Sequence, residues 1–204
     1  MSKRDIDELN RIPADAKQID CFCSGSQLQA EPQERWMNRK ETEAFPAVPL
    51  PSSALYNEVG AEALTGLVER HHQRLQLSVI GTLFPQQPHA FAATVAKSVA
   101  FILEGAGGPV DFTERHGEVR MRERHFPVSI DEAARDVWLL ELLRSFDDVD
   151  FPSHWRDTYW RWMEAFSLRM VNRRTRMEPL SRYRLADAQA SLLANLAAFG
   201  RLEQ

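Results

Sequence analysis

The sequence predicts an all-α fold, and three observations support this prediction. Several long segments repeat apolar residues at intervals of three and four, which is the spacing of one face of a helix. Glycine and proline separate these segments, and no segment shows the sustained alternation of a β-strand. With 204 residues, 44% hydrophobic and 26% charged, the chain has an ordinary globular composition. Its length fits either one domain of roughly 120 to 150 residues with extensions or two small domains.

Charge, hydropathy and cysteine content exclude several kinds of partner. The net charge of −4 gives no general attraction for nucleic acid. No apolar run approaches the roughly 18 residues of a membrane span, and the N-terminus lacks the apolar core of a signal peptide. Cys21 and Cys23 are too close for an unstrained disulfide and too few for a zinc site, so we expect reduced thiols. We therefore expect a cytoplasmic protein with no nucleic-acid or membrane partner.

The first 50 residues predict a largely irregular N-terminal extension. Residues 1–50 contain few periodic apolar positions and end in a proline-rich run, so they cannot bury enough apolar surface to fold independently. One short helix is expected near residues 33–43. Contacts with the main domain are expected through Trp36, Phe45 and Leu50.

Two helices follow, separated by a glycine. Ser52 and Ser53 are suitable caps for a short helix that Gly60 ends. The next helix, about residues 61–77, places His72 beside its apolar stripe. The stripe itself is Leu64, Leu67, Val68, His71 and Leu75. Two adjacent histidines therefore border an apolar interior, and we expect one to be buried and hydrogen-bonded and the other solvated.

The segment LFPQQP, residues 83–88, predicts a break with Phe84 as its apolar anchor. Pro88 suits the first turn of the next helix. That helix carries two adjacent stripes on its surface: Phe91, Val95, Val99 and Ile102, and beside them Thr94, Ser98 and Phe101. The glycines at 105–108 then predict a chain reversal, because no strand precedes them and no G-K-S/T follows, as a phosphate-binding loop requires.

The stretch from Gly107 to Trp138 is centred on His125. Three arginines, at 120, 122 and 124, lead into this histidine, and Ser129 to Glu132 match a capping box that starts a helix. The buried stripe of that helix is Ala133, Val137, Leu140 and Leu143. A single histidine is more often structural than a ligand, so its neighbours must decide its role.

The last two helices differ in character. Pro152 and Ser153 start a helix whose apolar face is unusually aromatic, which suits either a flat hydrophobic guest or plain core packing. That face is Trp155, Tyr159, Trp162, Phe166 and Met170. Residues 177–204 predict one amphipathic helix with Leu185, Leu192, Leu196 and Phe199 in line. Its apolar face is expected to pack on the domain or on a second copy, which would give a homodimer through the terminal extensions.

Several motifs in register now point to one family. They are LYNEVG, LFP, GGPVDFTERHG, RMRERH, RDVW and MVNR, in this order between Leu55 and Asn172. This region resembles a truncated haemoglobin, most closely of the second group. The resemblance implies a globin-like two-over-two helical sandwich over residues 51–176, between the N-terminal extension and the C-terminal helix, and haem b as cofactor.

The resemblance also implies which residues contact the haem. His125 matches the proximal histidine, the axial ligand of the iron. Arginines at 124 and 122 match the positions that pair with haem propionates. Trp138 matches the tryptophan whose indole N–H can donate to an iron-bound ligand. The expected haem-contacting set is His125, Arg124, Arg122, Phe84, Trp138 and Phe112.

The chain departs from the family on the distal side of the haem. The family usually has Phe-Tyr where this chain has His71-His72, so an imidazole, His72 or alternatively His71, replaces the tyrosine hydroxyl. Thr94 and Ser98 fall at two other distal positions, and Trp138 completes the predicted distal pocket. An imidazole can hydrogen-bond a ligand, but it can also bind the iron and close its sixth position.

Three functions fit this sequence. The first is a haem protein that binds a small diatomic or similar ligand such as oxygen, nitric oxide or sulfide. The second is a nitric oxide dioxygenase or a peroxidase-like enzyme, which would need an external reductase partner because the chain has no flavin motif. The third is a haem-free interaction protein that uses its extensions. We favour ligand binding over a dedicated enzyme.

Overall fold

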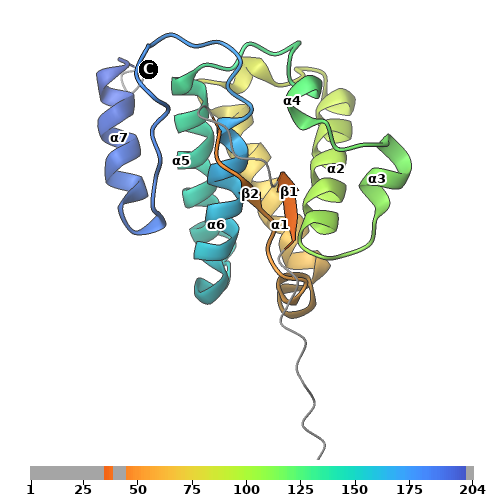
Figure 1. Ribbon diagram of the computed structural model, residues 1–204. Coiled ribbons are helices and arrows are strands. Elements are labelled where there is room, and N and C mark those ends of the chain that lie inside the picture. Colours follow the sequence, from red (N-terminus) through yellow and green to blue (C-terminus); the bar gives the residue numbers. More distant parts are fainter. Residues whose placement is uncertain (1–34, 39–44, 201–204) are drawn as a thin grey trace, which may run out of the picture. The chain divides into compact units, whose positions relative to one another are not determined.

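The computed structural model describes residues 35–38 and 45–200, and for 36–38 it describes the backbone (Figure 1). Most of the predicted N-terminal extension, including Cys21 and Cys23, lies outside the described residues, as does the side chain of Trp36. Within the described chain, no helix combines the length and the hydropathy that crossing a membrane requires.

Helices dominate the described chain, as predicted. Helix α1 packs against α2, α5 packs against α6, and α1 also contacts α5, so two helix pairs meet across one core (Figure 1). The all-α prediction and the two-over-two arrangement are confirmed. The helices and 3₁₀ turns are α1 (Ala54–Leu77), η1 (Gly81–Leu83), α2 (Pro88–Gly105), α3 (Asp111–His116), α4 (Met121–Arg124), α5 (Glu132–Asp148), α6 (Ser153–Leu168), η2 (Leu185–Asp187) and α7 (Ala188–Ala198).

Glycine and proline punctuate the helices where the sequence predicts. Gly60 has φ 83° and ψ 157°, so it kinks α1 between the two helical segments expected there. Pro88 occupies the first turn of α2. At the start of α1, the Ser52 hydroxyl accepts from the Ala54 N–H at 3.2 Å, while Ser53 makes no side-chain cap. Gly107, with φ 103°, supports the expected chain reversal after α2.

The helix predicted near residues 33–43 is contradicted at its centre. Strand β1 (Trp36–Asn38) pairs antiparallel with β2 (Val48–Pro49). Long-range pairing has overridden the weak local helix preference of this stretch. Val48 is fully buried and Leu50 packs against the core, so the end of the N-terminal extension is attached to the domain as expected.

The start of α5 also differs from the prediction. Its N-cap is Asp131, whose carboxylate accepts from the Ala134 N–H at 2.7 Å, and Ser129 lies outside the helix. The Glu132 carboxylate does not turn back as in a capping box. It accepts instead from the backbone N–H and the hydroxyl of Thr175, at 3.0 and 2.7 Å. The Glu132 carboxylate, which would bind the backbone at the helix start in a capping box, therefore binds a segment that is distant in the sequence.

The C-terminal helix is shorter than the predicted range 177–204. Within that range residues 177–184 are not helical, and α7 covers Ala188–Ala198. Leu192 and Leu196 are buried, and α7 packs against α5 (Figure 1). The apolar face of α7 was predicted to pack either on the domain or on a second copy of the chain, and in the structure it packs on the domain.

Candidate functional site

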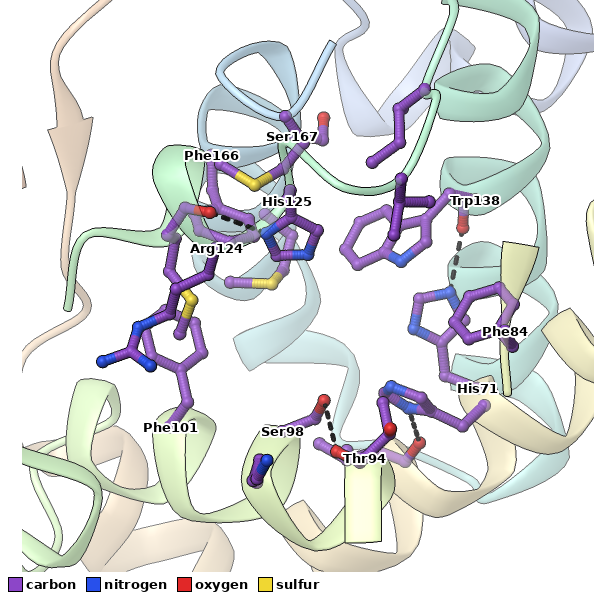
Figure 2. A pocket seen from close by; sticks show the side chains of 18 of the residues that line it. His71, Phe84, Thr94, Ser98, Phe101, Arg124, His125, Trp138, Phe166 and Ser167 are labelled. Carbon is purple, nitrogen blue, oxygen red and sulfur yellow. Dashed lines mark hydrogen bonds between the residues drawn. The ribbon is translucent and has the colours of Figure 1, made fainter. Parts of the chain in front are cut away.

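A cavity of about 800 Å³ lies between the two helix pairs (Figure 2). Its volume falls within the roughly 300 to 1,000 Å³ of pockets that bury small molecules and cofactors. Of the predicted site residues, those that line it are His71, His72, Phe84, Thr94, Ser98, Phe112, Arg124, His125 and Trp138. The fold therefore brings together side chains from α1, α2, α3, α4 and α5 that are far apart in the sequence.

His125 is the C-cap of the short helix α4, and its ring points into the cavity (Figure 2). Its Nδ1 lies 2.7 Å from the carbonyl oxygen of Met121. Because a carbonyl can only accept, Nδ1 carries the proton and Nε2 keeps its lone pair. Asn172 fixes the backbone of this residue, since its side-chain amide donates to the His125 carbonyl at 2.9 Å. This fixed, half-buried imidazole has the arrangement of a metal-ligating histidine.

Both histidines of α1 are buried, which corrects the expectation that one of them is solvated. The Nε2–H of His71 donates to the Trp138 carbonyl at 2.9 Å, and the Nδ1–H of His72 donates to the Val68 carbonyl at 2.8 Å. Burial, together with the nearby His72, lowers the pKa of His71 to about 3. Burial also lowers the pKa of His72. Both imidazoles are therefore neutral at pH 7, and each retains one nitrogen lone pair.

Helix α2 contributes two hydroxyls to the cavity wall opposite His125 (Figure 2). The Thr94 hydroxyl donates to the Ala90 carbonyl at 3.0 Å, and the Ser98 hydroxyl donates to the Thr94 carbonyl at 3.1 Å. Such bonds to the preceding helical turn use the hydroxyl proton. These oxygens can therefore accept a hydrogen bond from a guest, but they have no proton left to donate.

The two arginines predicted at the haem edge separate in the structure. Arg124 lines the cavity, and its guanidinium lies 5.6 Å from the Phe112 ring centroid. Arg122 does not line it; its guanidinium donates to the carbonyls of Arg169 and Val171 at 2.7 and 3.2 Å. Residues that are two positions apart on a helix are rotated by about 200° around its axis, so the side chains of Arg122 and Arg124 face opposite ways.

Sequence reasoning missed two cations of the cavity wall. Lys97 lines the cavity and is exposed, and it follows Thr94 by one helical turn on α2. Arg135 lines the cavity from α5 and is buried, with a 2.8 Å ion pair to Glu164. Its position three residues before Trp138 places it on the same face of α5, so this spacing could have predicted it.

Only part of the aromatic face predicted for α6 borders the cavity. Tyr159, Phe166 and Met170 line the cavity, whereas Trp155 and Trp162 do not.

Comparison with known proteins agrees with this geometry. The family model of bacterial-like globins matches residues 54–172. The chain belongs to the bacterial-like globins. It is 30% identical over 120 residues to the group 2 truncated hemoglobin YjbI of Bacillus subtilis (strain 168). The aligned region covers 59% of this chain and 89% of that protein. The group II truncated globin predicted from the motifs is thereby confirmed.

Solved structures of similar proteins extend the match. The phosphate-bound Hell's gate globin IV is 40% identical, with a TM-score of 0.69, and covers 75% of this chain and 97% of its own. The truncated oxygen-avid haemoglobin of Bacillus subtilis is 29% identical, with a TM-score of 0.54, and covers 57% of this chain and 98% of its own. Membership of this family implies a haem cofactor and the binding of a ligand.

The residues of the cavity fit a haem. The walls are largely apolar and aromatic, one fixed imidazole keeps a lone pair, and Arg124 and Lys97 line the cavity with cationic side chains that are exposed to solvent. A haem has the same division, with an apolar ring, a metal that accepts nitrogen ligands and propionates that stay near water.

Proposed function

We propose that this globin binds haem b in the cavity, with His125 as the proximal ligand, and binds a small molecule such as oxygen, nitric oxide or sulfide at the iron. The observation that carries the proposal is the tautomer of His125. Its Nδ1–H is committed to the Met121 carbonyl, so the lone pair of Nε2 is available to a metal. When bound, the haem supplies an iron with a further coordination position for a ligand.

The chain would hold the haem through a cationic edge and an apolar interior. Arg124 and Lys97 would pair with the propionates, with Lys97 in the place that the sequence alone suggested for Arg122. Phe84 and Phe112 would pack against the ring, and Phe112 is the more deeply buried of the two, at 3% exposure. Burial of these aromatic rings excludes water from the faces of the macrocycle.

Hydrogen-bond accounting singles out Trp138 as the donor on the distal side. Its indole N–H has no hydrogen-bond partner among the described residues, and the side chain lines the cavity. The neutral imidazoles of His71 and His72 have already committed their N–H groups to backbone carbonyls. Trp138 would therefore donate to the small ligand, whereas the two histidines present lone pairs.

A lone pair on a buried imidazole favours a bond to iron over a hydrogen bond to the ligand. We extend the proposal accordingly: without an external ligand, His72 or His71 would also hold the iron in part of the molecules. The low pKa of His71, about 3, supports this role because protonation does not compete for its lone pair near neutral pH. An external ligand would then compete with this histidine for the iron.

Haem titration of the purified chain tests the proposal. Haemin added to haem-free protein is expected to give a saturable Soret change at one equivalent. His125→Ala is expected to weaken haem retention by at least tenfold, because the axial bond is lost. His154→Ala is the matched control, since His154 is exposed on α6 and does not line the cavity. Equal retention by both variants would contradict the assignment of His125.

A further inference from the structure

Helix α4 and the residue after it contribute to a surface that lies away from the cavity. Arg122 does not line the cavity, and its guanidinium donates to the carbonyls of Arg169 and Val171. The same guanidinium lies 5.7 Å from the ring centroid of Phe126. That ring is 58% exposed and does not line the cavity either. The residue that follows His125 is therefore a large apolar side chain that solvent reaches.

Hydrogen bonds join this surface to the segment that follows α6. The side-chain amide of Asn172 donates to the carbonyls of His125 and Val128 at 2.9 and 2.8 Å. The backbone N–H of Arg173 donates to the carbonyl of Ile130 at 3.0 Å. The α4–α5 connection and the stretch after α6 also lie at the same end of the helices (Figure 1). Together they form one surface behind the backbone of the proximal histidine.

The segment that follows α6 is strongly basic. Residues 169–176 contain four arginines and no acidic residue, although the whole chain has a net charge of −4. Arg173 and Arg176 are exposed. Among the described residues, no ion pair joins a carboxylate to Arg122, Arg173 or Arg176. These three guanidinium groups can therefore pair with carboxylates of another molecule.

Two carboxylates close to this surface have other partners. Glu123, on the exposed side of α4, lies 3.7 Å from Arg120. Glu132, at the start of α5, lies 2.7 Å from Arg174. Neither carboxylate offsets the charge of the three arginines named above.

An exposed aromatic ring beside unpaired arginines is typical of a protein interface, in which polar groups surround an apolar centre. Within residues 122–130 and 169–176, Phe126 is the one large hydrophobic side chain that is exposed. A surface that lies on a membrane buries a broader apolar face. The composition therefore favours an acidic protein as the partner.

The proposed haem gives such a partner a role. Oxygen binds ferrous iron, so an electron is needed whenever the iron has become ferric. The chain contains no flavin motif, and a separate protein is therefore expected to supply that electron. A donor on this surface would lie behind the backbone of His125, which Asn172 contacts directly.

We propose that the surface formed by Arg122, Phe126, Arg173 and Arg176 docks a small acidic electron-transfer protein, which reduces the haem iron from the proximal side. The proposal rests on the proposed function, because the electron goes to the haem that His125 holds. The donor loses one electron and ferric iron gains it, so no further reactant is needed. Carboxylates around the donor's redox centre pair with the arginines, which guides the two proteins into contact.

Stopped-flow reduction of the ferric, haem-loaded protein tests this surface, with a reduced acidic flavodoxin as the probe. Arg173→Glu is expected to slow the reduction about three- to tenfold at low salt, because charge reversal weakens the steering of the donor. The difference is expected to vanish at 0.5 M salt, where the screening length falls to about 4 Å. Arg161→Glu is the matched control. Its side chain is 66% exposed on α6, about 12 Å before Arg169 along the helix axis.

A second variant and a second reductant separate docking from changes at the haem. Phe126→Ser is expected to slow reduction by flavodoxin at both salt concentrations, since it removes an apolar contact and no charge. Dithionite needs no docking surface. Its rate is expected to differ by less than about twofold among the parent and the three variants, because single surface charges affect a small reductant weakly.

The possible failures are distinguishable. If the protein loads haem and Arg173→Glu slows the flavodoxin reaction no more than Arg161→Glu does, the docking surface is refuted while haem binding stands. If the parent takes up no haem, the proposed function is refuted and the inference with it. Sedimentation of the parent, but not of Arg173→Glu, with phosphatidylglycerol vesicles would assign the surface to a membrane and contradict the proposal.

Discussion

The hydroxyl of Tyr183 offers a quantitative test of how the C-terminal segment is attached to the globin domain. This residue lies between α6 and α7, and its hydroxyl joins Asp136 on α5 to Asn195 on α7. The Asp136 side chain is 4% exposed and lies 3.7 Å from the guanidinium of Arg135. Tyr183→Phe removes the donor and leaves a buried carboxylate with one hydrogen bond fewer.

The expected cost follows from the kind of bond that is lost. A hydrogen bond to a charged group contributes about 1.5 to 3 kcal/mol, and an unsatisfied buried acceptor adds to its loss. For a domain of this size, each kcal/mol lowers the melting temperature by about 2 to 4 °C. Tyr183→Phe is therefore expected to melt about 3 to 12 °C below the parent. The pKa of Asp136, already raised by burial, should rise further, because the bond from Tyr183 opposes that shift.

Thermal and urea unfolding, followed by circular dichroism, measure this difference. Tyr159→Phe is the matched control, because it removes the hydroxyl of another buried tyrosine, one whose hydroxyl has no hydrogen-bond partner among the described residues. Equal melting temperatures for the two variants would refute the hydrogen-bond accounting at Tyr183. The comparison needs no haem, so it tests the fold separately from the function.

Two further predictions concern the distal histidines. The pKa of His71 is lowered from 6.5 to about 3, so the unfolded chain binds a proton that the folded chain excludes. His71 therefore does not lower the free energy of unfolding above about pH 6.5. Below that pH it lowers this free energy by about 1.4 kcal/mol per pH unit until the pH reaches about 3. His71→Leu should remove that slope in urea unfolding, and an unchanged slope would contradict the shift. The ligand-free haem protein should show a low-spin spectrum that becomes high-spin in His72→Ala or His71→Ala; a high-spin parent spectrum would exclude the sixth histidine ligand.

Local signals in the sequence predicted most of the helical frame. The stripe of α1, from Leu64 to Leu75, is buried as expected because one face of a helix must meet the core. Gly60 and Pro88 act through backbone geometry alone, so their effect does not depend on neighbours. All the predicted site residues except Arg122 line the cavity, because the motifs that contain them occur in a fixed order and spacing along the chain.

Features that depend on a distant partner could not be predicted in this way. The start of α5 was misplaced because Glu132 binds Thr175, more than forty residues away, instead of closing a local capping box. Arg122 was expected at the haem edge, but the carbonyl groups after α6 hold it on the opposite side of α4. No local pattern shows whether one or both histidines of an adjacent pair in an apolar stripe are buried. The buried position of His71 depends on its hydrogen bond to the carbonyl of Trp138 on another helix.

The absorption spectrum of the purified protein tests the central claim most directly. The claim is that the cavity holds a haem through His125. The parent protein, as isolated, reduced, and reduced with carbon monoxide, is expected to show a Soret band that shifts in each state, and His125→Ala is expected to lose most of the bound haem. A parent protein without a Soret band, even after haemin is supplied, or a His125→Ala variant with the parent spectra, would contradict the account.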